Sequence, residues 1–271
     1  MSNENPSNPL GTQGARPDQV AHELISRGAT KGMRGDTSGA IADLSAAIEL
    51  PGVTPEPVAV ALVNRGLAKS KQGDAAGAIA DYSAAIALPG APPEPVAVAL
   101  LNRGVAKGRE GDKAGELADF SAAIALPGAP RGLVAQALMS RGMAKGEQGD
   151  AAGAIADYSA AIELPDAPPG LVVQALINRG AMKGMQGDTE GAHADFSAAT
   201  ELQGAPPYVV AAACANLGMA CRALGRATEA RKWQERALAM ARHLPARAAE
   251  QVRQLLEEMG GVNEGDVARG G

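Results

Sequence analysis

The sequence predicts an all-α protein, a right-handed α-solenoid of six helix-turn-helix repeats followed by a C-terminal capping helix. Three observations lead to this fold class. One short motif recurs at a constant spacing, helix start and stop signals divide each repeat into two helices, and the residues of each helix follow a helical period. A fixed period in this range is typical of arrays in which each repeat packs only on its neighbours.

The recurring motif is an arginine followed by a glycine, and it occurs five times at steps of 38 residues. The five copies are Arg27-Gly28, Arg65-Gly66, Arg103-Gly104, Arg141-Gly142 and Arg179-Gly180. A sixth, less regular copy carries Leu217-Gly218 at the same place. The chain is therefore an array of similar units and not a mosaic of unrelated domains.

The second repeat, residues 57–94, illustrates how each unit divides into two helices. Pro57 opens the first helix, because proline suits a position where an N–H would have no partner. Gly73 ends this helix, and Asp74 can cap the next one by accepting hydrogen bonds from its first N–H groups. The second helix runs to about Leu88, where a Pro-Gly sequence breaks it.

Within this repeat, two sets of residues have the spacing i, i+4 and i+7 of one helical face. They are Leu62, Gly66 and Lys69 on the first helix, and Ala78, Tyr82 and Ala85 on the second. With the proline that follows, this pattern resembles the tetratricopeptide repeat (TPR), and it continues from Gln19 to about Arg242. The repeat is four residues longer than the family's usual length of about 34. Arginine and lysine also stand where the family often has leucine and tyrosine.

The repeats predict a division of the chain. Residues 1–18 form a disordered N-terminal lead, residues 245–259 an amphipathic capping helix and residues 260–271 a flexible tail. Between them lies the TPR-like array, residues 19–244, whose units are 19–56, 57–94, 95–132, 133–170, 171–208 and 209–244. The terminal repeat of a solenoid needs a polar outer face, which the last helix can supply by covering the sixth unit.

Composition and the absence of known motifs narrow the function classes. The net charge of -5 argues against nucleic acid or an acidic membrane as a partner. The N-terminus lacks the basic start and apolar run of a secretion signal, and nothing resembles a transmembrane span, so we expect a cytoplasmic protein. The sequence has no phosphate loop, nucleophile elbow or metal cluster, and therefore predicts no enzyme, no cofactor and no metal. Cys214 and Cys221, seven residues apart, are interpreted as packed thiols.

Each recurring arginine is accompanied by an aspartate sixteen residues later. The predicted structural pairs are Arg65 with Asp81, Arg103 with Asp119 and Arg141 with Asp157, and the first and fifth repeats have the same combination. In the sixth repeat both residues change, to Leu217 and Trp233. This joint change predicts that the guanidinium holds the carboxylate across the two helices.

A row of lysines, at Lys31, Lys69, Lys107, Lys145 and Lys183, recurs at the same period. It has two interpretations. The amines could follow a phosphate backbone, or their stems could be packed with the heads near carboxylates of adjacent helices. The acidic balance of the chain favours the second.

Positions that vary on the first helices are the candidate binding residues. In TPR arrays the first helices line a concave wall, and the resemblance implies an apolar stripe there beside a row of asparagines. The predicted groove residues are Val63, Asn64, Leu67, Leu101, Asn102, Val105, Met139, Ser140, Met143, Ile177, Asn178 and Met219. Alternatively, the stripe packs first helix against first helix, and the asparagines tie adjacent repeats together.

These patterns predict a non-enzymatic scaffold or adaptor for protein–protein interaction. We expect a peptide or an amphipathic helix of a partner protein to lie in the groove. Self-assembly into homo-oligomers is an alternative, and nucleic-acid binding through the lysines is a weaker one.

Overall fold

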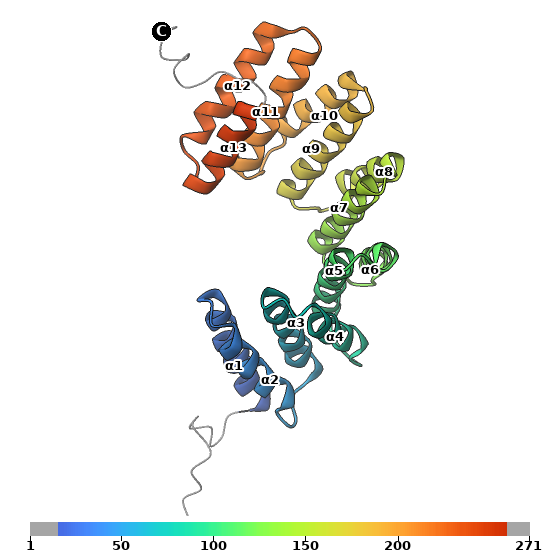
Figure 1. Ribbon diagram of the computed structural model, residues 1–271, viewed down its shortest axis with the longest axis vertical. Helices are drawn as coiled ribbons and strands as arrows, with labels where there is room; N and C mark the ends of the chain where they lie inside the picture. The colour runs from blue at the N-terminus through green and yellow to red at the C-terminus, as the bar shows by residue number, and fades with distance from the viewer. Residues whose placement is uncertain (1–15, 259–271) are drawn as a thin grey trace, which may run out of the picture. The chain divides into compact units, whose positions relative to one another are not determined.

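The computed structural model describes residues 16–258, in which every regular element is an α-helix (Figure 1). The predicted tail and residues 1–15 of the predicted lead lie outside the described residues. The chain divides into two compact units, residues 1–130 and residues 131–271. Each unit is considered separately below.

The described residues form thirteen helices. In the first unit these are α1 (Pro17–Met33), α2 (Thr37–Glu49), α3 (Pro55–Lys71), α4 (Ala75–Ala87), α5 (Pro93–Arg109) and α6 (Lys113–Ala125). In the second they are α7 (Arg131–Glu147), α8 (Ala151–Glu163), α9 (Pro169–Met185), α10 (Thr189–Glu201), α11 (Pro207–Ala223), α12 (Ala227–Ala241) and α13 (Ala246–Glu258). The odd-numbered helices α1 to α11 are the first helices of the six repeats, and the even-numbered helices are the second.

The predicted signals define the helix ends. Asp74 caps α4, because its Oδ1 accepts a hydrogen bond of 2.8 Å from the N–H of Gly77, and the second helices of the other four regular repeats have the same cap. Gly73 has a φ of 85°, the left-handed conformation that glycine adopts most easily after a helix. The last repeat differs, since Arg226 precedes α12 and its side chain makes no capping hydrogen bond.

Each first helix begins two residues before the predicted start of its repeat. In the second repeat Pro55 takes the first position of α3, so that Pro57 lies in the third position. Neither position needs a backbone N–H donor, because the first N–H groups of a helix have no intrahelical acceptor. A proline at either place therefore fits, and the sequence alone did not choose between them.

Within each unit the helices pack in consecutive pairs. In the first unit each helix contacts the next, and the first helices also contact one another, α1 with α3 and α3 with α5. The second unit repeats this order from α7 to α12, with α7 on α9 and α9 on α11. The final helix, α13, packs on α11 and α12, where the predicted capping helix would lie. This is the packing of an α-solenoid of helix pairs.

The glycine of the Arg-Gly motif allows close packing of the two helices in a repeat. Tyr82 of α4 is buried against Gly66 of α3, where a β-carbon would lie 2.6 Å from Cε1 of the ring. Phenylalanine or tyrosine contacts the matching glycine at Gly104, Gly142 and Gly180. The few aromatic residues of the chain are therefore concentrated where the two helices of a repeat meet.

Candidate functional site

The structure brings together every predicted arginine–aspartate pair. In the second repeat, Nε of Arg65 donates a hydrogen bond of 2.9 Å to Oδ2 of Asp81, and Nη2 donates one of 2.7 Å to Oδ1. The same two bonds join Arg27 to Asp43, Arg103 to Asp119, Arg141 to Asp157 and Arg179 to Asp195. Because the carboxylates are buried, these paired bonds fix how the two helices of a repeat dock.

The recurring lysine binds the same carboxylate. Nζ of Lys69 lies 2.8 Å from Oδ2 of Asp81, and the other four regular repeats have the same ion pair at 2.8–2.9 Å. We call each Arg–Asp–Lys set a clasp. The lysines are thus part of the helix packing, as the second interpretation of the lysine row expected, and are poorly placed to follow a phosphate backbone.

The charges of a clasp act on the acidity of its aspartate. Burial by itself would raise the pKa of Asp81, but hydrogen bonds and attraction from Arg65 and Lys69 outweigh this, and the pKa lies below its usual value. The pKa of Asp119 and that of Asp157 are lowered in the same way. These aspartates therefore stay ionised within the helix interface at neutral pH.

A serine of the preceding repeat also contacts the clasp, which the sequence reasoning missed. Nη1 of Arg65 donates a hydrogen bond of 3.0 Å to Oγ of Ser45 on α2, and Nη1 of Arg179 donates one of 2.9 Å to Oγ of Ser159 on α8. The signal was present, because a serine recurs at this place in each regular repeat. One guanidinium thus joins both helices of its own repeat to the repeat before it.

In the sixth repeat all three members of the clasp are replaced. Leu217 takes the place of the arginine, Cys221 that of the lysine and Trp233 that of the aspartate. Leu217 and Cys221 are buried, and Trp233 packs against them in one apolar cluster. The interface between α11 and α12 is therefore held by apolar contacts in place of charges.

The predicted groove stripe separates into a buried row and an exposed row. Val63, Leu101 and Ile177 are only 7%, 6% and 9% exposed. Their burial does not fit an open groove. Val63 shares an apolar cluster with Ala99 of α5, and Ile177 shares one with Ala213 of α11. The alternative interpretation, packing of first helix against first helix, therefore holds for Val63 and Ile177. Met139 and Ser140 of α7 are half-buried.

The exposed row lies four residues further along each first helix. It consists of Leu67, Val105, Met143 and Met219, which are 43%, 38%, 56% and 38% exposed. Large apolar side chains that remain this exposed leave surface that a partner could cover. These four are the members of the predicted stripe that the fold leaves open.

The three predicted asparagines and the equivalent Asn216 are half-buried and fall into two groups. Asn178 accepts a hydrogen bond of 3.2 Å from Gln174, and Nδ2 of Asn216 donates one of 2.9 Å to the carbonyl oxygen of Ala212. Within the described chain, the side chains of Asn64 and Asn102 have no hydrogen-bond partner. The amides of these two residues are therefore available to an incoming peptide backbone.

An apolar notch opens beside the exposed row in each unit. In the first unit it lies between α1, α2 and α3, measures about 140 Å³ and is lined by Gly28, Gly32, Met33, Leu44, Asn64 and Leu67, among others. In the second unit it lies between α9, α10 and α11, measures about 540 Å³ and is lined by Gly180, Gly184, Met185, Phe196, Asn216 and Met219, among others. The two sets occupy equivalent places four repeats apart.

The rim of each notch carries a methionine that the sequence reasoning missed. Met33 is 78% exposed and Met185 is 83% exposed. Each continues the stripe of its helix by one more step of four residues, where the other first helices have lysine, arginine, glutamate or alanine. The predicted stripe contained two positions per helix, four residues apart, and therefore did not include Met33 or Met185 at the next position.

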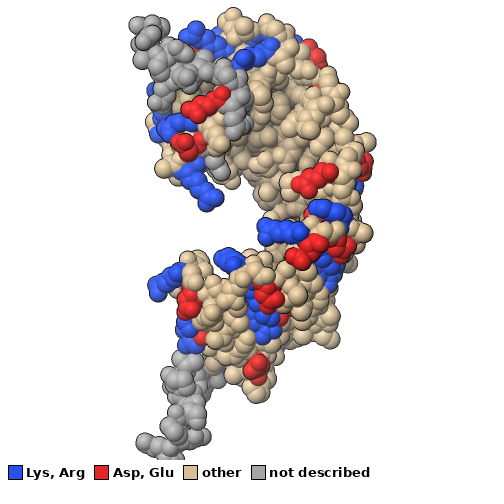
Figure 2. All heavy atoms as spheres, viewed as in Figure 1, with Lys and Arg blue, Asp and Glu red and all other residues tan. Residues whose placement is uncertain are grey.

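Charge on the visible surface is mixed. On the face shown in Figure 2, lysine and arginine side chains alternate with aspartate and glutamate, with broad uncharged areas between them. No helix among the described residues combines the length and apolarity needed to cross a membrane.

The paired helices, clasps and notches define an array of α-helical repeats. The tetratricopeptide repeat family matches residues 210–244, which form the sixth repeat. The sequence match thus covers the sixth repeat alone, and the other five repeats have the same helix-pair fold, which is that of a tetratricopeptide-like solenoid. Such proteins are typically scaffolds for protein–protein interaction and are generally not catalysts.

Several solved structures have the same fold. PilF of Pseudomonas aeruginosa is 15% identical, with a TM-score of 0.61 over 88% of this chain and 98% of that one. BtubC of P. vanneervenii is 17% identical, with a TM-score of 0.59 over 83% and 91%. PilW, a widely conserved type IV pilus biogenesis factor, is 20% identical, with a TM-score of 0.57 over 82% and 93%. Comparison with curated proteins gives no match in sequence. At these identities the likeness concerns the fold.

Proposed function

We propose that this protein is a non-enzymatic scaffold that binds an apolar peptide or amphipathic helix of a partner protein at the two notches. One observation carries the proposal. At equivalent places in both units, the fold leaves an apolar recess beside an exposed methionine and a second exposed apolar side chain. A repeated recess of this kind is suited to anchor side chains of a bound segment.

The chemistry of the rim suits a peptide. Methionine is unbranched and polarizable, so Met33 and Met185 can adapt to an apolar side chain entering the recess. Beside the first notch, the unpaired amide of Asn64 can exchange hydrogen bonds with a peptide main chain. Anchoring by apolar side chains, combined with polar contacts to the main chain, is a common mode of peptide recognition.

The two notches differ in capacity. The larger one falls within the range of about 300–1,000 Å³ that is usual for ligand pockets, whereas the smaller one is below it. We therefore expect the notch between α9, α10 and α11 to contribute more to affinity.

The experiment begins with peptides selected from a displayed random library against the full chain. The affinity of one synthetic peptide is then measured for the wild type, for Met185→Glu with Met219→Glu, and for the control Ala160→Glu on the exposed side of α8. We expect the double variant to lose binding more than about tenfold and the control to bind as the wild type does. The melting temperature of both variants should stay nearly unchanged, because the substituted side chains are exposed.

Two results would contradict the proposal. If the peptide binds the double variant as tightly as the wild type, the notch is not its site. If light scattering over a concentration series shows association of the wild type that the double variant abolishes, the occupant of the notch is a second copy of this chain, and self-assembly is the better function.

A further inference from the structure

Three residues depart from the repeat pattern at one place in the second unit. His193 of α10 stands where the four earlier repeats have isoleucine or leucine. Cys221 of α11 replaces the clasp lysine, and Glu229 of α12 replaces the glycine that receives the aspartate cap. These departures bring an imidazole, a thiol and a carboxylate into an array that has aliphatic, lysine and glycine residues at these places.

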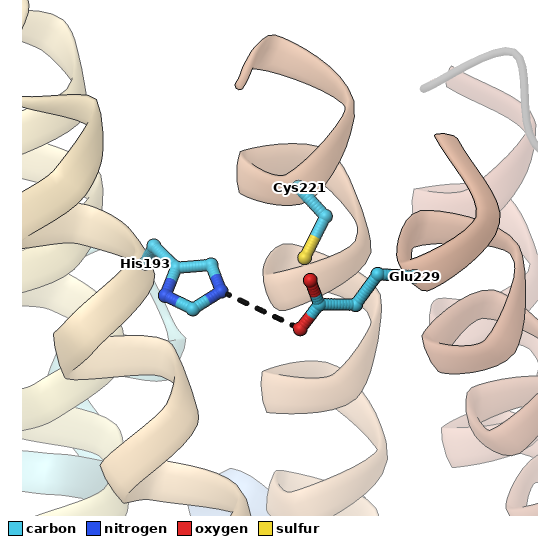
Figure 3. A group of neighbouring side chains, drawn as sticks. All are labelled: His193, Cys221 and Glu229. Atoms are coloured by element: carbon cyan, nitrogen blue, oxygen red, sulfur yellow. Dashed lines mark ion pairs between the residues drawn. The ribbon is translucent and has the colours of Figure 1, made fainter. Parts of the chain in front are cut away.

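The three side chains converge although they come from three helices. Their ligand atoms all lie within 4.8 Å of one another, and Nε2 of His193 is 3.8 Å from Oε1 of Glu229 (Figure 3). The thiol of Cys221 is buried, whereas Glu229 is exposed and His193 is half-buried. The group thus has a closed inner side and an outer side that is open to solvent.

From this geometry we infer that His193, Cys221 and Glu229 form a binding site for a divalent transition-metal ion, with Zn²⁺ as the ion that best suits the donors. Zinc accepts nitrogen, sulfur and oxygen ligands at about 2.0–2.3 Å, which places tetrahedral ligands about 3.3–3.7 Å apart. Side-chain rotations that bring the donors closer by about 1 Å satisfy this requirement. Calcium and magnesium prefer oxygen ligands alone and are disfavoured. Three protein ligands leave a fourth position for water or another donor.

Two features of the surroundings must change when an ion binds. Zinc binds cysteine as the thiolate, so binding releases the proton of Cys221. The guanidinium of Arg226 lies with Nη1 3.4 Å from Nε2 of His193 and pairs with Glu190. This exposed side chain has to swing aside as the ion enters.

The site would act where the array lacks a clasp. Its ligands belong to the second helix of the fifth repeat and to both helices of the sixth, so an ion would join α10, α11 and α12. A ligand that binds only the folded state stabilises it by mass action. Zinc should therefore raise the melting temperature of the second unit.

The test uses the full chain freed of metal with a chelator, and Zn²⁺ is titrated against a chromogenic competitor. His193→Ile restores the residue of the other repeats, and Cys221→Ala removes the thiol. Cys214→Ala is the matched control, because Cys214 is also buried in α11 but lies two turns away. We expect one Zn²⁺ per chain for the wild type and Cys214→Ala, with affinity reduced more than about tenfold in the other two variants.

A second measurement identifies the donors. Co²⁺ in place of Zn²⁺ should give a thiolate-to-cobalt charge-transfer band that is lost in Cys221→Ala and retained in Cys214→Ala. The inference is overturned if the wild type binds no Zn²⁺ at one equivalent. It is equally overturned if His193→Ile and Cys221→Ala bind as tightly as the wild type, which would indicate an adventitious ion only.

Discussion

Nη1 of Arg103 donates a hydrogen bond of 3.0 Å to Oγ of Ser83, a residue of the preceding repeat. The same hydroxyl donates a hydrogen bond of 2.7 Å to the carbonyl oxygen of Ile79, so it acts as acceptor and donor at once. Arg103, which pairs with Asp119 in its own repeat, is therefore also bound to α4 of the preceding repeat. Packing within a repeat and packing between repeats therefore depend on one side chain.

Ser83→Ala tests the bond between repeats. The substitution leaves Nη1 of Arg103 without its acceptor, and we expect the free energy of unfolding to fall by about 1 kcal/mol. Urea denaturation of the full chain measures this change. The control is Ser26→Ala, an exposed position on α1, for which we expect a change within about 0.5 kcal/mol. Equal effects of the two substitutions would contradict the role of the bond.

Arg103→Leu tests the clasp. Asp119 is left with Lys107 alone, and we expect a loss of about 3 kcal/mol in the free energy of unfolding, near the lower end of the range for broken buried pairs. Adding Lys107→Cys and Asp119→Trp copies the sixth repeat and should restore part of the loss. A double-mutant cycle between Arg103 and Asp119 should give a coupling above about 1 kcal/mol. A coupling energy below about 0.5 kcal/mol would mean that Arg103 and Asp119 do not stabilise each other.

Leu101→Glu and Val105→Glu compare the two rows of the stripe on one helix. Leu101 is only 6% exposed, so a glutamate there should cost more than about 3 kcal/mol. Val105 is exposed, and its substitution should leave the melting temperature nearly unchanged. Thermal unfolding followed by circular dichroism distinguishes them. Similar melting temperatures for the two variants would show that the division into rows is incorrect.

Gly66→Ala tests the approach of α3 to α4. The new methyl group would meet the ring of Tyr82, and we expect a loss of about 1–3 kcal/mol from overpacking. Gly32→Ala is the comparison, because its β-carbon would meet only Cβ of Ala40 at an ordinary 3.7 Å. Alanine also favours the helix there by up to about 1 kcal/mol. If chemical denaturation shows that Gly32→Ala has a lower free energy of unfolding than Gly66→Ala, this account is refuted.

The lowered pKa values of four clasp aspartates, Asp43, Asp81, Asp119 and Asp157, predict sensitivity to acid. A carboxyl group whose pKa is lower in the folded state stabilises the fold fully above its unfolded pKa of about 3.9, and this contribution is lost as the pH falls through the folded value. We therefore expect the free energy of unfolding to fall below about pH 4. Asp119→Asn should lower stability at pH 6 and reduce its dependence on pH below 4. If Asp119→Asn loses stability below pH 4 as steeply as the wild type does, Asp119 does not contribute to the acid sensitivity.

Local signals predicted the fold in detail. Helix ends depend on residues such as Gly73 and Asp74 that act within one turn, and the arginine–aspartate pairs could be deduced because Leu217 and Trp233 replace both members in one repeat. Which residues of the apolar stripe are exposed was predicted less well. A step of four residues turns a helical position by about 40°, and this is enough for Leu101 to be buried while Val105 is exposed. Periodicity alone does not say which of two adjacent rows meets a neighbour.

Contacts between side chains of different repeats could not be predicted from the sequence, for a related reason. The link from Arg103 to Ser83 and the convergence of His193, Cys221 and Glu229 depend on how three or four helices are placed together. In the sequence, His193 is only a histidine at a position where the earlier repeats have isoleucine or leucine. Its partners could be recognised only when α10, α11 and α12 were seen side by side.

The clasp also bears on how such an array can evolve. Changing it to the apolar arrangement of the sixth repeat takes three substitutions, and an aspartate or arginine left behind after the first is a buried charge with a missing partner. An intermediate that has lost only the arginine or only the aspartate is thus less stable than the intact clasp. Copying a whole repeat preserves the clasp without passing through these intermediates, so gene duplication lengthens this array more readily than point mutation remodels it.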